Sequence, residues 1–290
     1  MRRCALGPGG GFGWTGGRLR ETVRVVANFI IIETPSPLLL SFPHVGTALP
    51  GEVEERLTAA GRARHDTDWH LERLYDFAWE WGVGQLRAVW SRYLIDLNRA
   101  PDDRELYPGM VSTGLVPTVD FRGQRIVPAG EEPGEGERQR RREQYWEPYH
   151  RALSDWIRAR RGEWERVVVL ECHSIAPELP RLFEGRLPDF SLGTYGGRSC
   201  APELRDRLAE VLASSGRSHV VDGHFQGGYL TQHYGAPGDG VHVFQVEQAL
   251  STYADEAWPY AYRPERAEQV RPLLRELVRA ALEWARGGGR

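Results

Sequence analysis

The chain is poor in sulfur, with three cysteines (Cys4, Cys172 and Cys200) and two methionines among 290 residues. The cysteines are odd in number and have no metal-type spacing, which argues against a disulfide-stapled secreted domain and against a cysteine-ligated metal. We therefore expect a reduced protein that works in the cytoplasm.

No charge of one sign dominates, because the chain has 37 basic and 40 acidic residues, which leave a net charge of −3. Without a basic block, neither nucleic acid nor a membrane surface is an expected partner. Long apolar runs are lacking too: FIII at 29–32 is far too short to span a bilayer. Residues 1–20 contain too many glycines for the apolar core of a signal peptide, and we expect a disordered arm there.

Strand-like and helix-like segments alternate along the rest of the chain. Strands are expected at 22–33, 38–43, 86–90, 92–97, 166–171, 218–222 and 241–248, and helices at 68–81, 138–161 (kinked at Pro148), 201–214 and 264–286. Three stretches have a loop-like composition, namely 101–135, 179–200 and 223–240. The alternation predicts an α/β fold with a mostly parallel central sheet and helices on both faces. No linker divides residues 21–290, so we expect a single domain.

Histidines follow two of the buried strands. The run at 38–43 leads into His44, the run at 166–171 leads into His173, and the strand at 241–248 ends near Glu247. Parallel strands place their carboxyl ends along one edge of the sheet, so we expect these side chains to converge. Two imidazoles and one carboxylate are a common set of catalytic zinc ligands, and a further carboxylate such as Glu247 can take a proton from the attacking water.

Each of these residues also has an ordinary interpretation. His44 and His173 could be hydrogen-bonded residues at strand ends. Asp66 and Asp68, which precede the helix at 68–81, could be helix caps or the acidic metal ligand.

Asn98 and Arg99 close the segment at 92–97, where Asp96 could orient the arginine. Arg99 could bind a substrate carboxylate or stabilise an oxyanion, and a structural ion pair with Asp96 is the alternative. Residues 227–235 are interpreted as a wall of the substrate site or as a plain connection, because their glycines lack the spacing of a phosphate-binding loop. The further candidates for substrate contacts are Ser174, Gly228, Tyr229 and His233.

Several segments together resemble the N-formylglutamate amidohydrolase (N-formylglutamate deformylase) family over about residues 36–285. The matching stretches are SFPHVGTALP (41–50), DTDWHLERLYDFA (66–78), SRYLIDLNRAPDDRELYPG (91–109), YWEPYHRAL (145–153), ECHSIAPELPRLFEGRLPDFSLGT (171–194) and GGYLTQHYGAPGDGVHVFQVEQALSTYADE (227–256).

This resemblance implies a phosphorylase/hydrolase-like three-layer fold, similar to that of zinc carboxypeptidases, aspartoacylases and zinc-dependent muramoyl-alanine amidases. It implies zinc, or another divalent transition metal, as cofactor. The implied ligands are His44, His173 and Asp68, with Asp66 as the alternative acid. Glu247 is the implied base.

The implied reaction is hydrolysis of an N-formyl or other small N-acyl amide, with N-formylglutamate as the default substrate and formate and a free amine as products. Asn98 and Arg99 are similar to an Asn-Arg pair that contacts substrate oxygens in related zinc acylases. Ala176 and Gln232 stand where the family usually carries arginine, which removes two partners for substrate carboxylates. The alternatives are a zinc amidase or peptidase acting on a short peptide and an inactive binding homologue. The sequence indicates no oligomeric state.

Overall fold

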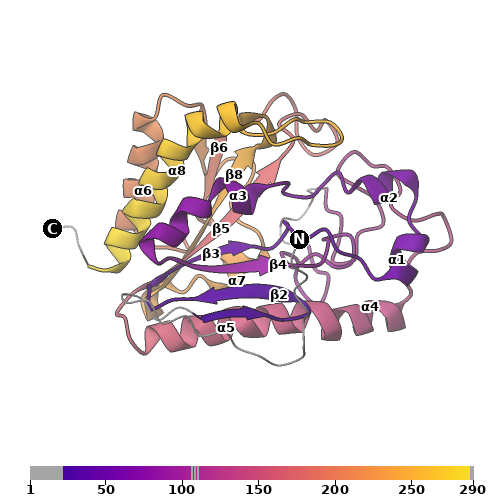
Figure 1. The fold of residues 1–290 in the computed structure, drawn as a ribbon, viewed down its shortest axis with the longest axis horizontal. Coiled ribbons are helices and arrows are strands. Elements are labelled where there is room, and N and C mark those ends of the chain that lie inside the picture. The colour runs from indigo at the N-terminus through magenta and orange to yellow at the C-terminus, as the bar shows by residue number, and fades with distance from the viewer. Residues whose placement is uncertain (1–21, 106, 108, 110, 288–290) are drawn as a thin grey trace, which may run out of the picture.

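The computed structural model describes residues 22–287 except 106, 108 and 110, so the arm expected over 1–20 lies outside the described residues. One eight-stranded sheet of order β1-β2-β4-β3-β5-β8-β6-β7 runs through this part of the molecule (Figure 1). The strands are β1 (Thr22–Val25), β2 (Phe29–Glu33), β3 (Leu38–Phe42), β4 (Gly84–Ala88), β5 (Val167–Ile175), β6 (Phe190–Gly193), β7 (His219–Val221) and β8 (Val241–Ala249).

The four central strands, β4, β3, β5 and β8, run parallel to one another. The pairings of β1 with β2, β2 with β4 and β6 with β8 are antiparallel, and β6 is parallel to β7. Every residue of β3 and β5 is buried, as expected of central strands covered on both faces. The predicted α/β class with a mostly parallel sheet is therefore confirmed.

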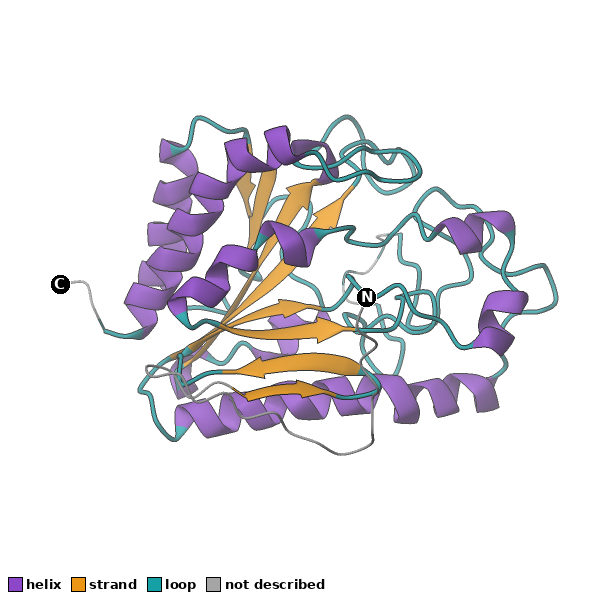
Figure 2. Cartoon of the chain, viewed as in Figure 1, coloured by secondary structure: helices purple, strands orange, loops and turns teal. Residues whose placement is uncertain are grey.

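Helices cover both faces of this sheet. The α-helices of the described residues are α1 (Gly51–Glu55), α2 (Ala59–Ala63), α3 (Leu71–Leu74), α4 (Glu135–Arg141), α5 (Glu147–Arg161), α6 (Pro202–Ser214), α7 (Tyr229–Tyr234) and α8 (Pro264–Ala285). Of these, α3, α6 and α8 pack on one face of the sheet, and α5 and α7 pack on the other. In β3, Leu38 and Leu40 pack with α3, α6 and α8, whereas Leu39 packs with α5 and α7. Figure 2 shows the long helices α5 and α8 on opposite sides of the sheet, which gives three layers. No helix in the described part of the chain combines the length and the apolar character needed to cross a membrane.

Two strand predictions need correction. The single strand expected at 22–33 is a hairpin of β1 and β2 that turns at 26–28. The strand expected at 92–97 is a series of turns, which bring Arg92 and Asp96 together in an ion pair. An extended chain would separate their Cα atoms by about 13 Å, so the pair requires a turn.

The loops expected at 179–200 and 223–240 contain regular structure as well. The first includes β6, which pairs with β8, and the second includes α7, which packs against β8. The sequence did not predict these two elements, because glycines flank both of them. Each nevertheless buries apolar residues, β6 within the sheet and α7 against it.

The expected helices are also less regular than their spacing suggested. The helix at 138–161 begins at Glu135 and consists of α4, a π-helical turn (Arg142–Trp146) and α5. Pro148 lies in the first turn of α5, so its effect is this wider turn in front of α5 instead of a kink within it. The segment at 68–81 consists of α3 and a 3-10 helix (Asp76–Trp81), and no aspartate side chain caps it.

A fully buried carboxyl group, that of Glu171 on β5, lies between the sheet and α5. Its Oε2 accepts a hydrogen bond from Ser41 Oγ at 3.0 Å, and its Oε1 has no partner. Burial raises the pKa of Glu171 from 4.5 to about 8. Between these values the unfolded chain releases a proton that the native state keeps, so the native state loses about 1.4 kcal/mol of stability per pH unit as the pH rises.

We predict that Glu171→Gln removes this loss. The free energy of unfolding of the variant, relative to the parent, should rise by about 1.4 kcal/mol per pH unit between about pH 5 and pH 8. Urea unfolding of metal-free protein at several pH values measures it. Tyr149→Phe, which removes a neighbouring hydroxyl but no carboxyl group, is the control and should change stability equally at each pH. If the free energies of unfolding of Glu171→Gln and the parent depend equally on pH, Glu171 does not keep its proton in the native state over this pH range.

Candidate metal centre

Three parallel strands carry the predicted side chains to one edge of the sheet. His44 lies two residues beyond β3, His173 lies within β5, and Glu247 lies within β8. The register of β5 and β8 places His173 directly beside Glu247. β5 extends beyond the predicted strand at 166–171, so His173 projects from the sheet itself, as Glu247 was already expected to do.

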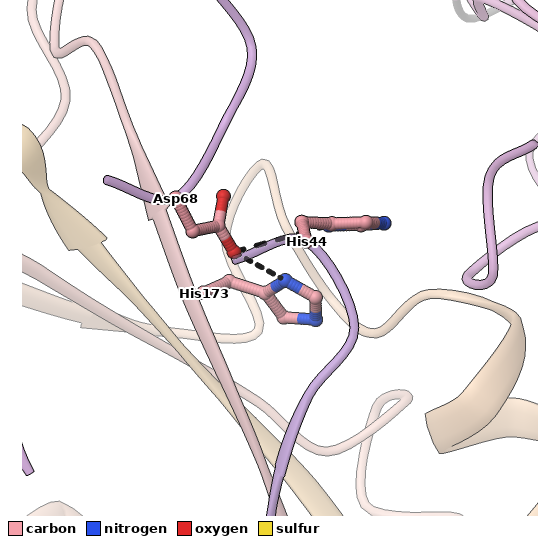
Figure 3. A group of neighbouring side chains, drawn as sticks. All are labelled: His44, Asp68 and His173. Atoms are coloured by element: carbon pink, nitrogen blue, oxygen red, sulfur yellow. Dashed lines mark hydrogen bonds and ion pairs between the residues drawn. The ribbon is translucent and has the colours of Figure 1, made fainter. Parts of the chain in front are cut away.

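His44, Asp68 and His173 form a buried group whose ligand atoms all lie within 4.8 Å of one another (Figure 3). Asp68 Oδ2 is 3.3 Å from His173 Nδ1 and 3.9 Å from His44 Nδ1. Two imidazole nitrogens and one carboxylate oxygen are donors that suit zinc and neighbouring divalent ions, with a fourth position left for water. The residues present therefore fit a catalytic metal ion.

The geometry distinguishes between the two candidate aspartates. Asp66 is turned away from the group, because its Oδ2 accepts the backbone N–H of Phe121 at 2.9 Å. Burial raises the pKa of Asp66 to about 7. Asp68 donates its backbone N–H to the carbonyl of His44 at 3.0 Å, which keeps its side chain beside the imidazole. Asp68 is thus the acid that the structure places with the histidines.

The carboxylate of Asp96, which is fully buried, orients His44. His44 Nε2 donates to Asp96 Oδ1 at 2.7 Å, so Nδ1 carries the lone pair; Nδ1 lies 3.9 Å from Asp68 Oδ2 and 3.3 Å from Arg92 Nη1. Burial and then the guanidinium of Arg92 lower the pKa of His44 to about 4, so the ring is neutral near pH 7. Burial alone would raise the pKa of Asp96, but Arg92, His44 and Arg99 hold it well below its usual range.

Asn98 contacts His173 from the other side. Asn98 Oδ1 accepts the backbone N–H of Leu230 at 2.9 Å, so Nδ2 is the atom 3.2 Å from His173 Nε2. An amide nitrogen only donates, so His173 Nε2 accepts and the ring proton lies on Nδ1, facing Asp68. A cation that binds Nδ1 must displace this proton.

Gly228 packs against this same asparagine. A Cβ atom at position 228 would lie 2.2 Å from Asn98 Nδ2, so any larger residue would displace the amide. The other two candidates from the glycine-rich segment, Tyr229 and His233, stack on each other with ring centroids 4.8 Å apart and do not line the cavity at the metal group.

Arg92 is the functional candidate that the sequence analysis missed. It lines the cavity, its Nη2 donates to Asp96 Oδ2 at 2.5 Å, and its Nη1 lies 3.3 Å from His44 Nδ1. Its guanidinium also lies over the ring of Phe121, 4.6 Å from the centroid. A spacing of four residues between Arg92 and Asp96 is the one signal that could have indicated it, provided that a turn had been expected there.

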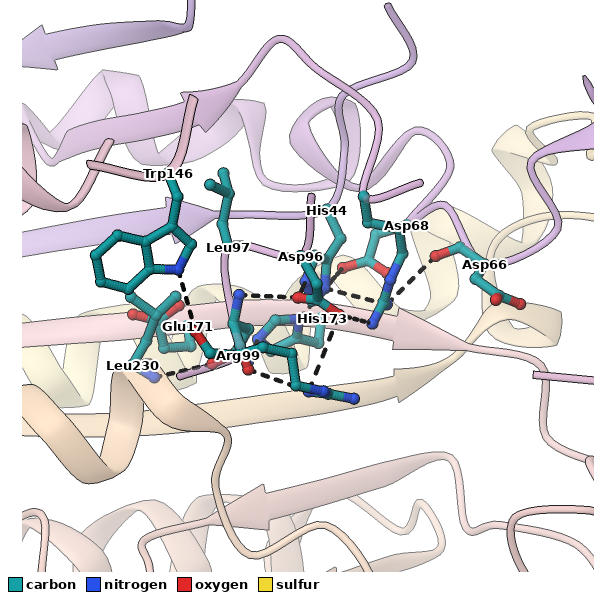
Figure 4. Close-up of polar contacts among 12 residues, drawn as sticks. His44, Asp66, Asp68, Asp96, Leu97, Arg99, Trp146, Glu171, His173 and Leu230 are labelled. Carbon is teal, nitrogen blue, oxygen red and sulfur yellow. Dashed lines mark hydrogen bonds and ion pairs between the residues drawn. The ribbon is translucent and has the colours of Figure 1, made fainter. Parts of the chain in front are cut away.

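Arg99 is held by its backbone and leaves part of its guanidinium accessible. The indole N–H of Trp146 donates to the Arg99 carbonyl at 3.1 Å (Figure 4). Arg99 Nη1 donates to the Asn98 carbonyl at 3.0 Å and lies 4.0 Å from Asp96 Oδ2. Its side chain keeps 21% of its surface exposed, so its remaining N–H groups can bind a ligand.

A cavity of about 140 Å³ opens beside the metal group. Glu247 lies on its wall, and in the described part of the chain no hydrogen bond engages the Glu247 carboxylate. Burial, and then the charge of Asp68, raises the pKa of Glu247 well above its usual range. Ser174 also lines the cavity, and its hydroxyl accepts a hydrogen bond from Tyr253 at 2.7 Å.

Two loops, 105–113 and 224–228, supply much of the remaining wall, and the Tyr107 hydroxyl joins them by donating to the Gly227 carbonyl at 2.6 Å. Ala176 and Gln232, the two neutral positions noted in the sequence, do not line this cavity. Ala176 packs against the apolar cluster that contains Phe121, and Gln232 Nε2 donates to the Gly227 carbonyl at 3.1 Å.

The two aspartates provide a matched test of the metal site. Asp68→Asn should weaken zinc binding by about 100-fold or more, because a charged ligand is lost. Asp66→Asn, an identical change at a buried position two residues away, should retain zinc. Titration of metal-free protein with a competing chelator measures both affinities, and loss of zinc in Asp66→Asn alone would assign the ligand to Asp66.

Gly228→Ala tests the position of Asn98. The added methyl must push the amide away from its contacts with His173 and Leu230, so we expect kcat/KM to fall by at least about tenfold. Gly238→Ala is the control, because a Cβ there meets nothing within 4 Å. If Gly228→Ala retains full activity towards an N-formyl amino acid, the position of the amide has no influence on the reaction.

Comparison with known proteins identifies the family of this chain. Residues 36–254 match the family model for N-formylglutamate amidohydrolase. An N-formylglutamate deformylase from Pseudomonas aeruginosa is 46% identical over 251 residues, covering 86% of this chain and 94% of that protein. An N-formylglutamate deformylase from Pseudomonas putida is 43% identical over 249 residues, with 86% and 93% covered.

Solved structures agree as well. The crystal structure of N-formylglutamate amidohydrolase from Ralstonia eutropha JMP134 superposes with a TM-score of 0.77 at 25% identity, covering 91% of this chain and 100% of that one. The gene product Atu2144 from Agrobacterium tumefaciens has the same fold, with a TM-score of 0.64 at 19% identity over 86% of this chain and 91% of that one. The chain belongs to the N-formylglutamate amidohydrolase family.

Proposed function

We propose that this protein hydrolyses the formyl amide of an N-formyl amino acid, with N-formylglutamate as the default substrate. The observation that carries the proposal is the buried group of His44, Asp68 and His173 beside a cavity that also holds Glu247. The 46% identity to a protein named N-formylglutamate deformylase supports the same reaction. Water adds to the formyl carbon, the C–N bond breaks, and formate and a free amine leave.

The three ligands suit zinc, and another divalent transition metal would accept the same donors. Such an ion supplies Lewis acidity, which polarises the formyl carbonyl and makes water a better nucleophile near neutral pH. The protein contributes one imidazole in the ligating tautomer, because Asp96 accepts from His44 Nε2, while Asn98 packs against the other imidazole, that of His173.

Glu247 is our candidate for the general base. It lies beside His173 across the β5–β8 pair, and its carboxylate faces the cavity without a competing hydrogen bond in the described part of the chain. It takes a proton from the attacking water and delivers it to the leaving nitrogen. Burial and then the negative charge of Asp68 raise the pKa of Glu247, and a cation at the group would offset the second of these causes and so favour the ionised carboxylate.

The two arginines have separate roles in this scheme. Arg92 lies beside His44, where its fixed positive charge would stabilise the oxygen that becomes negative as water adds. Arg99 has accessible N–H groups and would bind the substrate α-carboxylate. Ser174 and Gly228 on the cavity wall complete the proposed contacts.

A small substrate is favoured over a peptide, because the linked loops 105–113 and 224–228 form part of the wall. We also propose that the protein acts in the cytoplasm. Cys172 and Cys200 are buried free thiols, which suits a reducing compartment.

Replacing Glu247 by Gln tests the mechanism. We expect kcat to fall by about 10²–10⁴-fold, because proton transfer is lost, while zinc content and substrate KM change little. Steady-state kinetics and metal analysis of the purified protein measure this. Glu283→Gln, the same change on the exposed side of α8, is the control and should keep full activity. Normal turnover by Glu247→Gln would exclude Glu247 as the base.

A further inference from the structure

We propose that the wall of the cavity recognises the substrate side chain through neutral hydrogen-bonding groups. The enzyme would then accept N-formylglutamine, which carries a carboxamide, about as well as N-formylglutamate. This inference rests on the proposed function, since it concerns the substrate of the same site. The evidence for it is the charge of the side chains that line the cavity.

Two cationic side chains, Arg92 and Arg99, line the cavity among the residues that the structure describes. Arg92 is already engaged, because it donates to Asp96 Oδ2 at 2.5 Å and to the Asp66 carbonyl at 3.4 Å. Arg99 is therefore the guanidinium with capacity for a ligand. N-formylglutamate has two carboxylates, so one of them lacks a cationic partner.

The α-carboxylate is the one that Arg99 suits. In every N-formyl amino acid this carboxylate is one carbon away from the nitrogen of the scissile amide, so its partner must lie close to the metal group. Arg99 satisfies this requirement, because its Nη1 is 4.0 Å from the Asp96 carboxylate that holds His44. The far end of the substrate side chain is left to the loops 105–113 and 224–228.

No lysine or arginine of these two loops lines the cavity. Their described lining side chains that carry polar groups are Glu105, Tyr107, Ser112, Thr113, His224 and Gln226. Thr113 is only 9% exposed, and its Oγ1 has no hydrogen-bond partner among the residues that the structure describes. The imidazole of His224 packs edge-on against Phe183 and Phe225, and burial lowers its pKa, which keeps the ring neutral near pH 7.

Such a wall matches a carboxamide better than a carboxylate. A carboxamide donates and accepts, and hydroxyl, imidazole and amide groups can satisfy both functions. A carboxylate only accepts, and Glu105 adds a like charge to the wall. Strong preference for a charged group requires a charged partner, and none is available in these loops.

The test compares kcat/KM for N-formyl-L-glutamate and N-formyl-L-glutamine with the metal-loaded enzyme. We expect the two values to agree within about tenfold. A larger preference for the glutamate compound overturns this inference and leaves the proposed function intact. Hydrolysis of neither compound overturns the proposed function, and the inference with it.

A variant that restores a cation tests the cause. Gln226→Lys should shift the ratio of the two kcat/KM values towards the glutamate compound by at least about tenfold, because the new ammonium pairs with the second carboxylate. Gln269→Lys makes the same change on the exposed face of α8 and should leave the ratio unchanged. If Gln226→Lys binds metal normally and its ratio does not move, the charge of the wall does not set the specificity.

Discussion

The carboxylate of Asp96 connects the parts of this site. One oxygen accepts hydrogen bonds from His44 Nε2 and from the backbone N–H of Asn98, and the other accepts from Arg92. These donors come from the end of β3 and from the turns that follow β4. A single buried anion thereby fixes the tautomer of one proposed ligand, the position of the chain at Asn98 and the direction of one guanidinium.

Burial of this anion would be unfavourable without its donors. Every other buried charge in the centre needs a partner for the same reason. Asp68 and Asp96 both contact His44, and Arg92 is the positive side chain next to them. Arg92 also lowers the pKa of Glu247, but burial and the charge of Asp68 outweigh it and hold that pKa well above its usual range. The site is therefore arranged around a positive charge that the protein's own side chains supply only in part, which agrees with a metal ion at the His-Asp-His group.

The sequence predicted the fold class and the positions that meet at the sheet edge, because buried aliphatic runs and the residues that follow them are local signals. His44 and His173 are examples. Arg92 was not predictable in this way, because its role depends on turns that distant segments stabilise. Asp96 donates its backbone N–H to the Leu115 carbonyl, and Arg141 donates to the Leu94 carbonyl. Likewise, α7 was not predicted, because its flanks are rich in glycine and its stability comes from the packing of its apolar residues against β8.

The close approach of Gly228 to Asn98 has an evolutionary consequence. The missing side chain at one position makes room for the amide at the other, so neither residue can change in size alone. Because the same amide also accepts from Leu230 and contacts His173, a shorter side chain at 98 would lose both contacts. Positions 98 and 228 should therefore vary together or not at all among homologues, although 130 residues of chain separate them.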